Sequence, residues 1–412
     1  MKNEILTYLD DPRELEKLYR GNKTPFKQAF SALYPELKGN ALADFWNERL
    51  HYDTDDISWG TGRELLMVLI AALVASFIAK IPAMFQIDEE FFYPRNIVFI
   101  FLPLLTIYFA WKNKLQAKWI SVIFGIMTVS LIYINALPAS ATSDTLLLAC
   151  IHLPLLLWVL LGPAFVGNNL SDYSKWLAYL KYNGDLIIMT TLILIAGAIM
   201  SGVTVGLFAL IGFRIEQFYV AYIVVSGLSA APIVGTHLTQ TNPQLVSKVS
   251  PVIARIFSPL VLIMLVLYLF AILYSGKDPY NDREFLLIFN LLLIGVMAII
   301  FFSTAEMSRA STTATGMLFL LSTVTILVNG IALSAIVFRI AEWGITPNRL
   351  AVLGGNLLML LNLLFITIRL FRSFTKKSGI AAVGRSIAIF LPIYCLWAAV
   401  VIFLFPVLFS FR

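Results

Sequence analysis

From Thr61 onward the chain is a succession of long apolar runs separated by short polar connections. About 20 residues of α-helix cross the roughly 30 Å of hydrocarbon in a bilayer, and each run is near that length. The run 96–111 is short, and the run 218–237 carries Gly227, Pro232 and Gly235. The runs are 64–85, 96–111, 119–137, 145–165, 186–213, 218–237, 252–274, 285–303, 314–338, 350–371 and 386–409. The pattern predicts an all-α polytopic transmembrane helical bundle of about 11 spans over residues 61–412.

Residues 1–60 have a different pattern, mixing charged and apolar residues without a long apolar run. Asp11-Pro12-Arg13-Glu14 combines an N-cap, a first-turn proline and an N3 glutamate, which predicts a helix from Pro12 to Arg20 that stops at Gly21. A second helix after Thr24-Pro25 places Phe26, Phe30 and Leu33 on one face. A third, 41–52, carries Leu42, Phe45, Trp46 and Leu50 as its apolar stripe. We predict a small soluble helical domain that docks on the membrane domain or on a partner, because so few residues form a marginal core.

Composition agrees with this division. Hydrophobic residues make up 59% of the 412 residues, charged residues only 13%, and the mean hydropathy is +0.84. Soluble domains carry nearly twice that share of charge, so the class is an integral membrane protein. The net charge of +6 is explained by membrane topology, and nucleic acid is not an expected partner. Cys150 and Cys395 both lie in apolar runs and are interpreted as small hydrophobic residues.

The connections between spans differ in charge. Positive residues gather on the connections that share a face with the N-terminal domain, including Lys112, Lys114, Lys118, Arg369 and Arg372. The opposite face carries the acidic run from Asp88 to Glu90. Because cytoplasmic connections are enriched in Lys and Arg, we predict a multi-pass protein of the cell inner membrane with a cytoplasmic N-terminus.

Sequence motifs for catalysis are absent: the chain has no Walker loop, no strand-linked GxGxxG and no HExxH. The three histidines are too scattered to suggest a metal site, and we expect no cofactor. The acids fall almost entirely in predicted loops, which weighs against ion-coupled transport through a buried carboxylate. An enzyme therefore ranks below a protein without catalytic chemistry, and no catalytic residue is assigned.

A few polar groups fall inside the apolar runs. His152 lies near the centre of run 145–165, where an ionisable side chain is a functional candidate. Asn290, Asn329 and Asn356 lie in later runs, where they either form interhelical hydrogen bonds or line a solute cavity. Run 186–213 contains the GxxxG sequence Gly202 to Gly206, which indicates either close helix packing or a broken helix lining a cavity.

The most charged connection between two apolar runs extends from Arg339 to Arg349, and we call it the island. Gly344 suits a left-handed helix C-cap, and Thr346-Pro347 suits the start of the next helix. Arg349 falls in that helix's first turn, where the macrodipole disfavours a cation, so we expect an anionic partner, with Glu342 the nearest. Arg339 shares a helix face with Glu342. Two interpretations stay open: a hairpin held by a salt bridge, and an anion or headgroup site at a helix N-terminus.

The stretch Glu342-Trp343-Gly344-Ile345-Thr346-Pro347-Asn348-Arg349 resembles the E-aromatic-G-hydrophobic-T-x-x-R signature of the domain of unknown function 4153 family, which groups bacterial integral membrane proteins. The stretches 43–50 and 91–96 also resemble members of that family. The resemblance implies a bacterial inner-membrane location, and it implies no particular activity.

Two functions follow from these observations. The first is binding or transport of a small or lipidic solute, with candidate residues Arg339, Glu342, Thr346, Arg349, His152, Asn290, Asn329 and Asn356. The alternative is a membrane sensor or assembly factor that recruits a protein partner through the N-terminal helices, for which an exposed apolar stripe at Phe45, Trp46 and Leu50 is expected. Membrane lipids are partners in either case.

Overall fold

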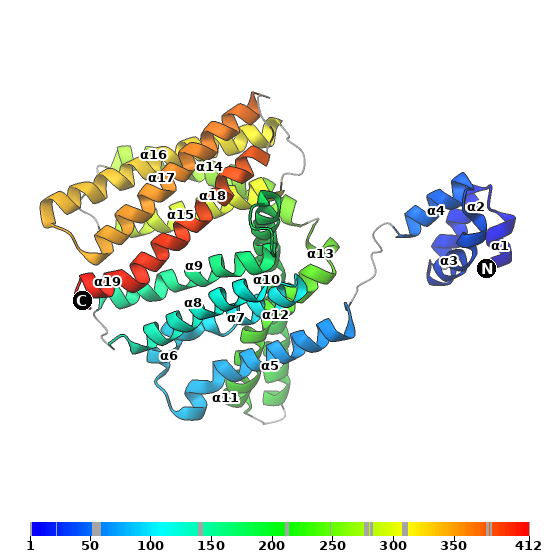
Figure 1. The fold of residues 1–412 in the computed structure, drawn as a ribbon, viewed down its shortest axis with the longest axis horizontal. Coiled ribbons are helices and arrows are strands. Elements are labelled where there is room, and N and C mark those ends of the chain that lie inside the picture. Colours follow the sequence, from blue (N-terminus) through cyan, green and yellow to red (C-terminus); the bar gives the residue numbers. More distant parts are fainter. Residues whose placement is uncertain are drawn as a thin grey trace. The chain divides into compact units, whose positions relative to one another are not determined.

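A computed structural model of the chain describes residues 2–21, 23–51, 59–138, 143–210, 214–247, 249–275, 280, 283–306, 312–375, 379 and 381–411. Within these ranges every regular element is a helix (Figure 1). The chain divides into two compact units, Met1–Ser58 and Trp59–Arg412.

The N-terminal unit has its own apolar core. It comprises α1 (Lys2–Thr7), α2 (Pro12–Gly21), α3 (Lys23–Leu37) and α4 (Ala41–His51). The predicted start of α2 is confirmed, because the Asp11 carboxylate accepts the backbone N–H groups of Arg13 and Glu14 at 2.9 and 3.2 Å. The predicted face of α3 is also confirmed, since Phe26, Phe30 and Leu33 are all buried.

The predicted stripe of α4 is partly wrong. Trp46 and Leu50 are buried in the core together with Ala43, whereas Phe45 is 59% exposed. Positions 43, 46 and 50 lie on one side of a helix, and position 45 points away from that side. The predicted last residue of this helix, Tyr52, lies outside the described residues.

The membrane unit contains ten helices or near-continuous helical stretches, among the described residues, that are long and apolar enough to cross a membrane. The remaining predicted run, 252–274, falls on α14, whose described apolar stretch is Ile256–Leu267. The fold is therefore an all-α polytopic helical bundle. The elements are α5 (Gly62–Phe85), α6 (Glu89–Asn96), η1 (Ile97–Phe99), α7 (Leu102–Lys112), α8 (Ala117–Ala136), α9 (Asp144–Val166), α10 (Tyr173–Leu210), α11 (Glu216–Tyr219), the π-helix η2 (Val220–Val224), α12 (Val225–Thr241), α13 (Gln244–Ser247), α14 (Ser250–Ser275), α15 (Arg283–Glu306), α16 (Thr312–Trp343), α17 (Pro347–Phe374), α18 (Ala381–Ala399), the π-helix η3 (Val400–Leu404) and α19 (Phe405–Leu408).

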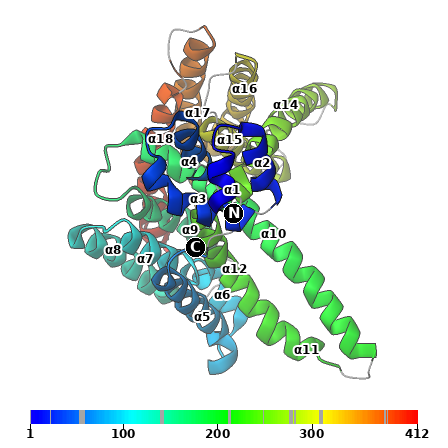
Figure 2. The ribbon, with the colours of Figure 1, turned by 90° about the vertical axis from the view of Figure 1, so that its right-hand side faces the viewer.

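The stretch from α10 to α12 differs in direction from most of the other helices, although α12 packs against α5. In both ribbon views α10 and α12 run side by side, at a steep angle to most of the bundle (Figure 1, Figure 2). α10 is one continuous helix, so the broken-helix interpretation of run 186–213 is wrong. Among the described residues no other helix packs closely against this motif, because a Cβ at Gly202 or Gly206 would meet no described atom within 4 Å.

Two larger cores fill the membrane unit. The first joins α5, α7, α8, α9 and parts of α10 and α18 around residues such as Phe109, Leu157 and Tyr179. The second joins α14 to α17 and part of α18 around residues such as Phe289, Val328 and Ile366. Polar side chains lie in or beside each core, and they include several of the candidate functional residues.

Candidate solute-binding site

The island at the α16–α17 connection forms a capped hairpin. Gly344 has φ +77° and ends α16, as predicted. Thr346 caps α17, because its hydroxyl oxygen accepts the Arg349 backbone N–H at 3.3 Å. Both cap predictions are confirmed.

The predicted charge pairing in the island is wrong. The Arg349 guanidinium donates to the carbonyls of Trp343 at 2.8 Å and of Gly344 at 2.7 Å, which are acceptors at the C-terminal end of α16. Glu342 is exposed and forms no ion pair with another described residue. The Arg339 guanidinium carbon lies 5.3 Å from the centre of the Trp343 ring. The helix-end carbonyls supply the negative end of a dipole, so Arg349 does not need a carboxylate.

The structure brings three predicted asparagines together in the second core. The Asn356 side-chain amide donates to the Asn290 side-chain oxygen at 2.8 Å, and the Asn329 amide donates to the Asn356 backbone carbonyl at 3.1 Å. We call this set the amide network. Asn329 and Asn356 are at most 1% exposed. The bonds link α15, α16 and α17, which is what interhelical amides do in lipid.

His152 does not join the amide network. Its Nδ1 lies 2.8 Å from the carbonyl oxygen of Leu148, one turn earlier on α9. A hydrogen bond to the helix's own backbone satisfies one ring nitrogen without a ligand. A functional role for His152 therefore stays a prediction without support from a neighbouring polar side chain.

The first core contains a charged group that the sequence analysis missed. Glu64, in the first turn of α5, is buried, and its Oε1 accepts the Tyr108 hydroxyl at 2.5 Å and the Lys112 ammonium at 3.1 Å. His237 on α12 is 2% exposed, and neither ring nitrogen has a hydrogen-bond partner among the described residues. We call Glu64, Tyr108, Lys112 and His237 the charged cluster. One of the few acids outside the predicted loops, Glu64 at the start of run 64–85, is therefore buried and paired.

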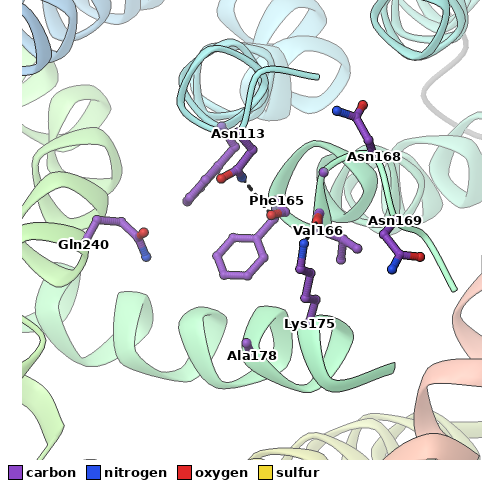
Figure 3. Close-up of a pocket in the computed structure, with 10 residues that line it drawn as sticks. Asn113, Phe165, Val166, Asn168, Asn169, Lys175, Ala178 and Gln240 are labelled. Carbon is purple, nitrogen blue, oxygen red and sulfur yellow. Dashed lines mark hydrogen bonds between the residues drawn. The ribbon is translucent and has the colours of Figure 1, made fainter. Parts of the chain in front are cut away.

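Beside the charged cluster lies a pocket of about 450 Å³ (Figure 3). Its lining combines side-chain amides, one lysine and aromatic rings. In Figure 3 Gln240 extends from α12 toward Phe165. The lining residues are Phe109, Asn113, Phe165, Val166, Gly167, Asn168, Asn169, Lys175, Ala178 and Gln240.

Two of the pocket's amides hold its rim. Asn113 donates to the carbonyls of Ala164 and Phe165 at 3.0 and 2.7 Å, which are acceptors in the last turn of α9. Asn168 accepts the Gln116 backbone N–H at 2.9 Å and donates to the Lys114 carbonyl at 3.1 Å. These four bonds tie the α7–α8 turn to the end of α9. The rim is therefore held by hydrogen bonds within the protein and is formed without a ligand.

Other lining groups keep bonding capacity. No hydrogen bond of the Asn169 or Gln240 side chain is found among the described residues, and the Lys175 ammonium has one, a 3.3 Å contact with the Val166 carbonyl. Beside Lys175, the Asp172 carboxylate accepts the Ser174 hydroxyl at 2.6 Å, which lowers the pKa of that carboxyl. Asp172 is thus ionised at neutral pH and occupies the N-terminus of α10.

The floor of the pocket is aromatic. The Phe165 ring centre lies 4.9 Å from that of Phe109, 5.1 Å from Tyr182 and 5.4 Å from Tyr179. Phe109 is 1% exposed and Tyr179 is completely buried. The rings pack at the distances of ordinary aromatic pairs, so the pocket borders a packed aromatic cluster.

Sequence reasoning missed these residues for identifiable reasons. Glu64 follows Gly60 by four residues, so in the sequence it resembles an acidic residue in the first turn of a helix at the membrane surface. Its backbone N–H does donate to the Thr61 hydroxyl, which caps the helix. Tyr108 and Lys112 are spaced i, i+4 at the end of a run, which was the one available signal of a shared helix face. No sequence pattern places α5, α7 and α12 side by side. In the described part of the chain no three His, Cys, Asp or Glu side chains are grouped as metal ligands.

The spanning helices and the amide-lined pocket define a polytopic α-helical membrane protein with a polar pocket beside its first core. No family model, curated protein or solved structure matches the chain. The resemblance to the domain of unknown function 4153 family stays a prediction.

Proposed function

We propose that the membrane unit binds a small solute or a lipid headgroup in the pocket of Figure 3 and passes it across the membrane without enzymatic chemistry. The observation that carries the proposal is the pocket's lining. Gln240, Asn169 and Lys175 have capacity for further hydrogen bonds, while Asn113 and Asn168 hold the rim in place. A concave site with a few convergent polar groups over an aromatic base is the usual form of a small-molecule site.

The lining favours a ligand that carries hydrogen-bond acceptors. Lysine has three donors and no acceptor, and each carboxamide can donate two hydrogen bonds. A carboxylate, a phosphate or a hydroxylated headgroup fits such donors. Lys114 in the α7–α8 connection and Lys118 in the first turn of α8 add positive charge that attracts an anionic ligand.

The aromatic floor supports a transport role. A pocket that ends on packed rings is open to one side only, and a transported solute must be released on the other side after those rings move apart. With the N-terminus in the cytoplasm, as the charge distribution favours, this pocket faces the cytoplasm of a bacterial inner membrane.

The test uses purified protein in detergent and a library of phosphorylated, carboxylated and hydroxylated metabolites and lipids. We expect a subset to raise the unfolding temperature of the wild type, and Gln240→Leu and Lys175→Met to abolish the shift. Glu342→Gln, in the distant hairpin, is the control and should keep it. If no compound stabilises the wild type more than Gln240→Leu, the proposed pocket is not a binding site.

The alternative, recruitment of a partner by the N-terminal helices, lacks the stripe it required. Trp46 and Leu50 belong to that unit's own core, and of the three residues only Phe45 is exposed. Recruitment therefore stays a prediction from the sequence alone.

A further inference from the structure

We propose that the island binds the phosphate of an anionic lipid, held by the two arginines Arg339 and Arg349 beside the ring of Trp343. The residues that line the solute pocket belong to other helices, so this lipid site does not depend on the pocket. It corresponds to the headgroup interpretation of the island, since the structure contradicts the hairpin held by a salt bridge.

Two cations share one aromatic ring. The guanidinium carbon of Arg339 lies 5.3 Å from the centre of the Trp343 ring, and that of Arg349 lies 5.7 Å from it. A cation within about 6 Å of a ring centre is attracted to the face of the ring. Trp343 thus brings together two positive charges that belong to different helices, α16 and α17.

Arg349 keeps one edge of its guanidinium for a ligand. Both of its side-chain hydrogen bonds come from Nη1, which donates to the carbonyls of Trp343 and Gly344. No hydrogen bond of Nε or Nη2 is found among the described residues. These two nitrogens form an edge that donates two parallel bonds to a phosphate or a carboxylate. Because the carbonyls fix the side chain, this edge is oriented before a ligand arrives.

The charges of the island favour an anion. Glu342 is its only acid, and this carboxylate is exposed and forms no ion pair with a described residue. α17 begins at Pro347, and the N-terminal end of a helix carries partial positive charge. A phosphate therefore meets two guanidinium groups close to the positive end of a helix dipole.

The surroundings of the two arginines favour a lipid over a soluble anion. The island joins two helices that are long and apolar enough to cross a membrane, so it lies at the membrane surface. Trp343 is 45% exposed, Ile345 63% and Phe338 41%. Tryptophan side chains gather at the level of the lipid headgroups. The Phe338 ring lies 6.2 Å from the Trp343 ring and begins an exposed apolar face that an acyl chain can contact.

The site is therefore selective for a phospholipid with a net negative charge. Its phosphate contacts the arginines, and its chains lie along α16. With a cytoplasmic N-terminus, as the charge distribution predicts, the island faces the outer side of the membrane.

The test measures lipid binding to the full-length protein in detergent by native mass spectrometry. The probes are phosphatidylglycerol, which carries a net negative charge, and phosphatidylcholine, which is zwitterionic, with the same acyl chains. Inorganic phosphate is added as a soluble competitor. The variants are Arg339→Gln, Arg349→Gln and Trp343→Ala. Arg214→Gln removes an exposed arginine from the α10–α11 connection and is the matched control.

We expect the wild type to bind phosphatidylglycerol more tightly than phosphatidylcholine. Arg339→Gln and Arg349→Gln should each weaken binding of phosphatidylglycerol about fivefold, which corresponds to about 1 kcal/mol per arginine near an anionic surface. They should weaken binding of phosphatidylcholine less, because that lipid has no net charge. Trp343→Ala should weaken binding of both lipids, and Arg214→Gln should change neither.

Arg349→Gln also removes the hydrogen bonds to the end of α16, so the unfolding temperature of each variant is measured without lipid. Arg339→Gln leaves those bonds in place and gives the same test in a protein with an intact hairpin. Arg349→Lys keeps the charge without the two-donor edge, and it should restore only part of the binding.

The proposal is overturned if both arginine variants keep the wild-type preference for phosphatidylglycerol. It is also overturned if inorganic phosphate displaces this lipid at an equal concentration, which would identify a site for a soluble anion. Lys175→Met, in the solute pocket, should leave the preference unchanged. Loss of the preference in Lys175→Met alone would place the lipid in the pocket, whereas a failure of the solute pocket to bind any compound would leave the lipid site unaffected.

Discussion

The charged cluster and the amide network show two ways of placing polar groups in a membrane unit. The amide network lies in the second core, where uncharged side chains bond one another or a backbone carbonyl across α15, α16 and α17 and stay at most slightly exposed. The charged cluster lies at one end of the first core, adjacent to a pocket, and contains an acid, a base and a histidine whose nitrogens have no described partner. Bonds between neutral amides hold helices together, whereas a charge next to an open pocket can change with ligand or pH. Under the proposed function, the first core contains the site and the second is a scaffold.

The largest loss of stability is expected when a ring of the aromatic floor is removed. Phe109→Ala should destabilise the protein by about 3–5 kcal/mol, because a buried ring is lost and a cavity remains. Phe289→Ala, which removes a fully buried ring from the second core, is the matched control and should cost a similar amount. Only Phe109→Ala should raise the thiol reactivity of a Gln240→Cys reporter several-fold. Equal reactivity in both variants would mean that the rings do not close the pocket.

A smaller loss of stability distinguishes the charged cluster from the amide network. Glu64→Leu should cost about 2 kcal/mol, because Tyr108 and Lys112 lose their shared acceptor, and the double variant Glu64→Leu, Lys112→Met should recover part of that loss. Asn356→Leu removes one amide bond and should cost about 1 kcal/mol. The free energy of unfolding of these three variants is measured in increasing concentrations of a denaturing detergent. A Glu64→Leu cost no larger than that of Asn356→Leu would show that Tyr108 and Lys112 do not depend on the Glu64 carboxylate.

Adjacent glycines on α17 test how tightly the helices beside the amide network pack. A Cβ at Gly354 would come within 2.0 Å of Trp397 Cζ2, whereas one at Gly355 would meet no described atom within 4 Å. Gly354→Ala should therefore destabilise by about 1–3 kcal/mol through overpacking. Gly355→Ala should be neutral or slightly stabilising, because alanine is the better helix former. Equal unfolding temperatures for the two variants would show that α17 and α18 are not in close contact.

The smallest effect concerns the hairpin. Thr346→Ala removes the cap of α17 and should cost about 1 kcal/mol. Glu342→Gln should leave stability unchanged, because Glu342 pairs with no described residue. A clear loss of thermal stability in Glu342→Gln would restore the salt bridge predicted from the sequence.

Much of the fold was predictable because it depends on local patterns. Apolar run lengths located the spans, and Gly344, Thr346 and Asp11 set helix ends through their own backbone and side-chain chemistry. The partners of each helix were not predictable. Glu64 and His237 are far apart in sequence, and only the packing of α5 against α12 brings them together. The partner of Arg349 was not predictable either, although it lies nearby in the sequence. The charges suggested the Glu342 carboxylate, but Arg349 donates to backbone carbonyls at the end of α16.

The central claim is that the pocket of the first core is open to one side of the membrane while the second core is closed. The direct test is labelling of Gln240→Cys and Asn356→Cys by a membrane-impermeant thiol reagent, in a background with Cys150 and Cys395 replaced by serine. We predict that Gln240→Cys reacts in inverted vesicles and not in right-side-out vesicles, and that Asn356→Cys reacts in neither. Labelling of Asn356→Cys at the rate of Gln240→Cys, or of Gln240→Cys from the outer side alone, would contradict the account.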